Sequence, residues 1–128
     1  MRYLLLLFAL LVAGCDSTSN RPVDVSFDSI SGGWTGRFTA SDGLEYFLEI
    51  NIQEQLSAVS GTGRLTAGSR ELPFEITGSF NAPSVSWTFN LSNQPPISVV
   101  GTVNDALSQM TLRLVGSGFG GDEVLLIR

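Results

Sequence analysis

The stretch GGWTGRFTA, residues 32–40, begins an alternation of apolar and polar side chains that continues to the end of the chain. The apolar face of this stretch consists of Trp34, Gly36, Phe38 and Ala40. A period of two is that of a β-strand, in which successive side chains point to opposite faces of a sheet. The stretch therefore predicts a strand with one buried face and one exposed face.

Seven further runs repeat this alternation. They cover residues 44–53, 59–65, 71–80, 85–92, 97–103, 110–116 and 123–128. Asp42-Gly43 separates the first two strands, and an Asp-Gly pair favours a tight hairpin turn because both residues tolerate positive φ. No window of 11 or more residues has the helical period of 3.6, so we expect no substantial helix in residues 32–128.

Eight short strands joined by short turns predict an all-β fold, an eight-stranded antiparallel up-and-down meander barrel over residues 32–128. Closure covers a single core and removes both exposed sheet edges. Glycines recur in the strands, at Gly61, Gly78, Gly101 and Gly116, where they let strands bend at barrel corners. A two-sheet β-sandwich remains the alternative.

The N-terminal stretch MRYLLLLFALLVAGC, residues 1–15, has one arginine followed by an apolar run. That run is shorter than the roughly 20 residues needed to span a bilayer and is typical of a secretory signal. Its end, Val12-Ala13-Gly14-Cys15, resembles the lipobox of bacterial lipoproteins. The resemblance implies that residues 1–14 are a cleaved signal peptide and that Cys15 is lipidated. The alternative is an ordinary cleaved signal with an incidental cysteine.

Residues 15–31 are then expected to form the lipidated cysteine and a polar tether that holds the domain off the membrane surface. Which membrane of the envelope carries the anchor stays open. Cys15 is the only cysteine in the chain, so we expect no disulfide in the domain.

The charge pattern argues against several classes of function. The net charge is −5, all seven basic residues are arginine, and histidine is absent. Nucleic-acid binding requires clustered positive charge, so we expect none. Without histidine, imidazole acid–base chemistry is excluded, and the glutamates alternate with apolar residues on faces expected to be solvated. We predict no enzymatic activity, no metal and no cofactor, and we interpret GSGFGGDEV, residues 116–124, as a final hairpin loop with Asp122 and Glu123 in solvent.

Gly32-Gly33-Trp34 is similar to the Gly-x-Trp motif that begins the first barrel strand in the calycins, which include lipocalins, fatty-acid-binding proteins and avidins. The resemblance implies that Trp34 plugs one end of the barrel and that an arginine near the end of the last strand packs across it. Arg128 is the candidate, with Arg113 in reserve. A guanidinium can stack on an indole and bind backbone carbonyls at the same time.

Two functions remain for a membrane-anchored, non-catalytic domain. The calycin resemblance implies a binding module with a small apolar or amphiphilic ligand in the barrel, and its lining would be Tyr46, Phe74, Trp87 and Phe89. Alternatively, these four side chains pack as core, and the outer surface contacts an envelope protein or polymer. A cavity above roughly 300 Å³ would favour the first function, and a filled barrel with an exposed apolar patch would favour the second.

Overall fold

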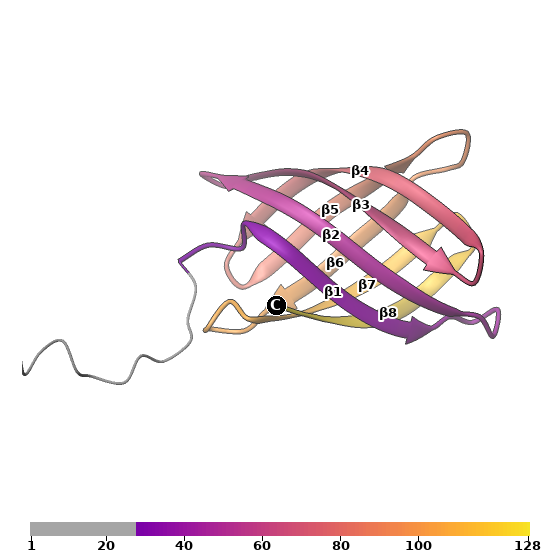
Figure 1. The fold of residues 1–128 in the computed structure, drawn as a ribbon. Helices are drawn as coiled ribbons and strands as arrows, with labels where there is room; N and C mark the ends of the chain where they lie inside the picture. The colour runs from indigo at the N-terminus through magenta and orange to yellow at the C-terminus, as the bar shows by residue number, and fades with distance from the viewer. Residues whose placement is uncertain (1–27) are drawn as a thin grey trace, which may run out of the picture.

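A computed structural model of the protein describes residues 28–128, which form one closed antiparallel β-barrel (Figure 1). The strands are β1 Gly32–Thr39, β2 Glu45–Gln55, β3 Ala58–Ala67, β4 Arg70–Asn81, β5 Ser84–Leu91, β6 Ile97–Val103, β7 Gln109–Gly116 and β8 Phe119–Ile127. Each strand pairs with the next along the chain, so the predicted meander is confirmed. The lipobox, Val12 to Cys15, and most of the expected tether lie outside the described residues.

The barrel closes where β1 pairs with β8, with Thr35 opposite Ile127. This seam decides between the barrel and the sandwich, and it confirms the barrel. Gly36 lies at the seam, where an added Cβ atom would stand 2.2 Å from the carbonyl oxygen of Leu125. A residue without a side chain is therefore needed for the two backbones to approach each other.

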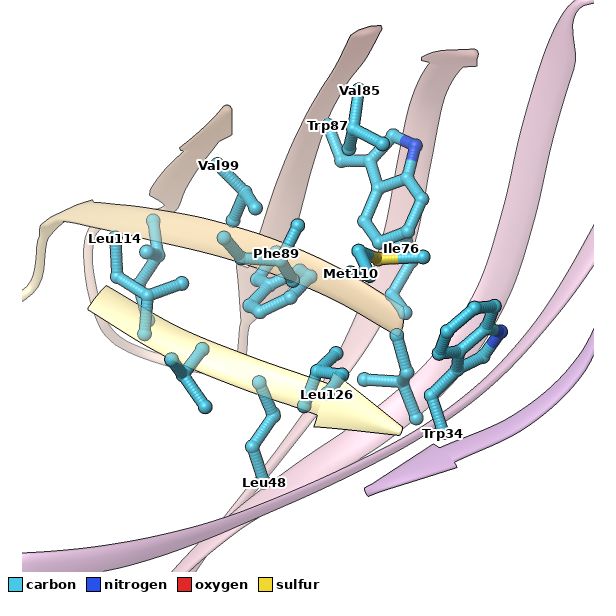
Figure 2. Close-up of a cluster of buried hydrophobic side chains, with 14 of the residues drawn as sticks. Trp34, Leu48, Ile76, Val85, Trp87, Phe89, Val99, Met110, Leu114 and Leu126 are labelled. Carbon is cyan, nitrogen blue, oxygen red and sulfur yellow. The ribbon is translucent and has the colours of Figure 1, made fainter. Parts of the chain in front are cut away.

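The inward side chains form one apolar core that runs through the barrel (Figure 2). The strands alternate between buried and exposed positions, as the period of two requires. None of the buried residues in the described part of the chain is polar or charged. Residues 28–128 also contain no helix that is long and apolar enough to cross a membrane.

The last hairpin differs from the sequence prediction of a long glycine-rich loop. The chain turns at Ser117 and Gly118, with φ values of 50° and 96°, and β8 already begins at Phe119. Two consecutive residues with positive φ make a tight turn that matches the twist of the flanking strands, so no longer loop is required.

Asp122 pairs with the inward residue Leu114 in the regular register that β8 keeps from Asp122 to Ile127, and a bulge at Gly121 shifts the register only toward the turn, where Val115 pairs with Gly120. Asp122 is half-buried and its Oδ2 atom is buried, so the prediction that it lies in solvent was wrong. Glu123 is exposed, as predicted.

Candidate functional site

Trp34 closes the end of the barrel at which β1 begins, here called the plug end. Its side chain is fully buried, and its indole nitrogen donates a hydrogen bond of 2.9 Å to the carbonyl oxygen of Ile30. The guanidinium carbon of Arg128 lies 4.4 Å from the centroid of the indole ring. The contact between Trp34 and Arg128 predicted from the sequence is therefore present.

Arg128 also binds two other segments of the chain at the plug end, the β6–β7 loop and the segment that precedes β1. Its Nε atom donates to the carbonyl oxygen of Leu107 at 2.9 Å, and Nη1 donates to that of Ser31 at 2.7 Å. Nη2 donates to the carbonyl oxygen of Ser29. Burial lowers the pKa of the Arg128 guanidinium, which nevertheless stays charged at neutral pH.

The segment that precedes β1 belongs to this plug. Ile30 is fully buried, and its amide donates a hydrogen bond of 3.1 Å to Oε1 of Glu54. In return, the amide of Glu54 donates to Oγ of Ser31 at 2.8 Å. Residues 29–31, which we expected to be the end of the tether, are thus fixed to the barrel.

The opposite end, here called the loop end, is filled by aromatic side chains. The ring centroids of Phe38, Tyr46 and Phe119 lie 5.2–5.9 Å apart. The Tyr46 hydroxyl donates to Oδ2 of Asp42 at 3.1 Å. Burial, and then the hydrogen bond to the Asp42 carboxylate, raise the pKa of Tyr46 above its ordinary value.

Asp122 holds the β1–β2 loop over this aromatic group. Its Oδ1 atom accepts a hydrogen bond of 3.0 Å from the amide of Ser41. Its Oδ2 atom is buried and has no hydrogen-bond partner within residues 28–128. Asp122 continues the inward alternation of Val124 and Leu126, a signal that the sequence contains, although the glycine-rich stretch before it equally suits an open loop.

The four predicted pocket residues pack against the core instead of surrounding an empty space. Tyr46, Phe74, Trp87 and Phe89 are all buried, with at most 4% of each residue exposed. The rings of Phe74 and Phe89 stack with centroids 4.1 Å apart. Trp87, from β5, points into the barrel interior, as Figure 2 shows. The structure thus brings Phe74 and Phe89 together and places Tyr46 in the separate group at the loop end.

Shallow hollows lie on the outside of the barrel, across β1 to β5. One of about 440 Å³ runs from Gly33 to Pro73, a second of about 460 Å³ lies beside Gln53 and Thr77, and a third of about 550 Å³ reaches Asn90. All three share the lining residue Thr62, so they adjoin one another. We call the three together the wall groove. Their outward lining residues include Gly33, Glu49, Asn51, Thr62, Arg64, Pro73, Glu75 and Asn90.

The side chains of the wall groove are polar and mostly uncharged. Arg64 makes ion pairs with Glu49 at 3.1 Å and with Glu71 at 3.4 Å. Asn51 and Thr62 are exposed and make no side-chain hydrogen bond within the described residues. Sequence reasoning missed this site because each of its residues, taken singly, resembles an ordinary solvated strand face.

The other side of the barrel, β6 to β8, carries the half-exposed apolar side chains. Val100, Val115, Leu125 and Ile127 are 47–51% exposed. They do not form one continuous patch, because Val100 pairs with Arg113, Leu125 with Thr111 and Ile127 with Gln109, and singly exposed aliphatic residues are common on soluble proteins. The outer wall therefore has a polar, hollowed side and a more apolar side.

Comparisons with known proteins place the chain in no family. No protein-family model matches the sequence, and no curated protein or solved structure gives a significant match. No group of three or more histidine, cysteine, aspartate or glutamate side chains within residues 28–128 is arranged to hold a metal ion. The functional proposal therefore rests on the geometry of the wall and of the two barrel ends.

Replacing Arg128 with lysine should lower the free energy of unfolding by about 2–3 kcal/mol. Lysine keeps the charge but lacks the planar fork that stacks on Trp34 and reaches the carbonyls of Ser29 and Ser31. Urea denaturation measures the difference. The matched control is Arg113→Lys on the exposed face of β7, which should change the stability by less than about 0.5 kcal/mol. Equal effects of the two changes would contradict the role given to Arg128.

The raised pKa of Tyr46 makes the stability depend on pH in the alkaline range. The folded chain holds the phenol proton more tightly than the unfolded chain does, so this contribution is complete below about pH 10. It is lost as the pH rises through 10 toward the pKa of the folded state. The chain has no lysine, and Tyr46 is the only tyrosine of residues 28–128, so few other groups titrate there.

Denaturation curves from pH 8 to 11 should therefore show falling stability for the native sequence and a flatter profile for Tyr46→Phe. Absorbance titration of the phenol gives the folded-state pKa directly. An ordinary pKa near 10, or an equally steep loss in Tyr46→Phe, would show that burial and Asp42 do not hold this proton.

Proposed function

We propose that this protein is a lipid-anchored protein of the bacterial cell envelope that binds another envelope component through the outer wall of its barrel. The wall groove carries this proposal, because its outward side chains are exposed and offer uncharged hydrogen-bonding groups at Asn51, Thr62 and Asn90. The barrel itself serves as a rigid, non-catalytic support for that surface.

The packed interior favours the wall over the barrel lumen as the binding surface. Side chains from all eight strands belong to one buried cluster, and the aromatic residues expected to line a pocket contact other core residues. A small apolar ligand would have to displace these contacts, and packed cores resist the loss of even a methylene-sized volume. The half-exposed aliphatic residues of β6 to β8 add a second part of the wall that could face a partner.

The lipobox supports the lipid anchor. The position of the plug indicates which end of the barrel lies nearer the membrane. The chain leaves the barrel at the plug end, where Ser29 and Ser31 are bound by Arg128. Residues 16–27 can span at most roughly 40 Å when fully extended, so the plug end is the part of the barrel tied nearest to the membrane that holds Cys15. The wall runs away from this end and is open to other components.

Replacing Cys15 with serine tests the anchor. The variant should move from the membrane fraction to the soluble fraction of the cell envelope, because the acyl chains that hold it would be absent. The native chain should be labelled by an alkyne analogue of palmitate, and the variant should not. Unchanged membrane fractionation of Cys15→Ser would remove the lipoprotein part of the proposal.

Photo-cross-linking in intact cells tests the wall. Benzoylphenylalanine in place of Thr62, in the wall groove, or of Thr111, on the outer face of β7, should give a light-dependent adduct of higher mass. The reference position is Ser69, which lies in the exposed turn at the loop end. No adduct at Thr62 or Thr111 beyond that seen at Ser69 would contradict binding through the wall.

A further inference from the structure

We infer that the wall groove binds a neutral, hydroxyl-rich chain, that is, a glycan strand. Glycan binding would be the specific form of the wall contact proposed above, and it rests on that proposal. Four features of the wall groove lead to it: a continuous row of side chains, their hydrogen-bonding chemistry, the local charge, and the lack of any free sheet edge.

A row of outward residues crosses five neighbouring strands. Gly33 of β1 lies opposite Asn51 of β2, which lies opposite Thr62 of β3, and the row continues through Glu75 of β4 to Asn90 of β5. Strands are spaced about 4.8 Å apart, so this row is about 19 Å long. Figure 1 shows these five strands side by side. The row gives an elongated ligand regularly spaced polar contacts across the strands.

The side chains of this row offer both donors and acceptors. The Asn51 amide and the Thr62 hydroxyl can each donate and accept, and neither has a side-chain partner within the described residues. Asn90 contacts only Thr77, at 3.3 Å. A hydroxyl group also donates and accepts, so a ligand with many hydroxyls can satisfy such a mixed row. Pro73 adds an exposed apolar surface beside it for the carbon face of a sugar ring.

The local charge disfavours an anionic ligand. The single cation of the wall groove, Arg64, is already paired with Glu49 and Glu71. Glu75 adds a negative charge that no described cation pairs. An anionic polymer such as a nucleic acid would meet repulsion here and no free cation. A neutral glycan meets neither obstacle.

The closed barrel disfavours an extended peptide as the ligand. Peptides commonly bind sheets by pairing with a free edge strand, where unpaired backbone groups are available. The strands from β1 to β5 pair with one another along continuous ladders, so this part of the described wall presents no such edge between them. A ligand on this wall must therefore be recognised through side chains, which the row provides.

Gly33 leaves the β1 end of the row open, because it has no side chain. A Cβ atom added there would approach nothing closer than the carbonyl oxygen of Ile50 at 3.9 Å, an ordinary contact. The φ angle of Gly33 is not in the positive range either. A larger side chain can thus fill this end of the wall groove without straining the strand. The matched control is Gly120, an exposed glycine of β8 with no atom within 4 Å of an added Cβ.

The test uses the full-length protein, isotopically labelled and solubilised in a detergent without a sugar headgroup. Chitohexaose and cellohexaose are added at millimolar concentration, and the amide resonances are followed by NMR. We expect saturable shifts centred on Asn51, Thr62 and Glu75. The two hexasaccharides differ in the N-acetyl group at C2, so comparing them separates recognition of amino sugars from recognition of plain hexoses.

Gly33→Leu should raise the dissociation constant about tenfold by occupying the end of the wall groove, and Gly120→Leu should leave it unchanged. Asn51→Ala, which removes one donor and one acceptor, should weaken binding in the same direction. The inference is overturned if neither hexasaccharide produces saturable shifts at the row, or if Gly33→Leu and Gly120→Leu bind alike.

These outcomes separate the inference from the proposed function. A cross-link from position 62 to a protein, together with no response to either hexasaccharide, would reject the glycan but keep the wall as the binding surface. No wall cross-link and no saccharide response would reject both.

Discussion

The structure depends on the stacking of Arg128 on Trp34. This contact joins the last residue of the chain to the first strand, and hydrogen bonds to Ser31, Ser29 and Leu107 fix the entry segment and the β6–β7 loop at the same point. A meander becomes a barrel only if its first and last strands pair. The plug supports that pairing at one end, while Gly36 lets the two backbones approach each other at the seam.

Because the interior of the barrel is filled, the outer wall is the surface available for binding a partner. An apolar core with stacked aromatic rings stabilises the barrel. The polar residues of each strand point to the outer surface, where they can contact a partner. On β1 to β5 those positions form the wall groove, whereas on β6 to β8 they include half-exposed aliphatic residues. The same alternation that makes the core thus builds two different outer surfaces.

The sequence predicted the strands, the meander and the Trp34–Arg128 contact, because side-chain alternation is local and the motif at Gly32 to Trp34 is recognisable. It did not predict the half-buried position of Asp122, because the glycine-rich stretch 116–121 indicated an open loop even though Asp122 continues the alternation of Val124 and Leu126. Nor could it show the row through Asn51 and Thr62, since register between strands is set by turns and closure. The sequence pattern also could not show whether the rings of Phe74 and Phe89 line a cavity or fill the interior, because both arrangements place these residues on the inward face.

The most direct test of the filled barrel is a crystal structure of the protein purified from its native cells at a resolution that shows individual side chains. We predict continuous side-chain density through the interior, with the rings of Phe74 and Phe89 stacked and no density for a bound molecule between the plug and loop ends. An elongated density inside the barrel, with these rings moved apart, would contradict a filled core. It would indicate that a small ligand binds inside the barrel.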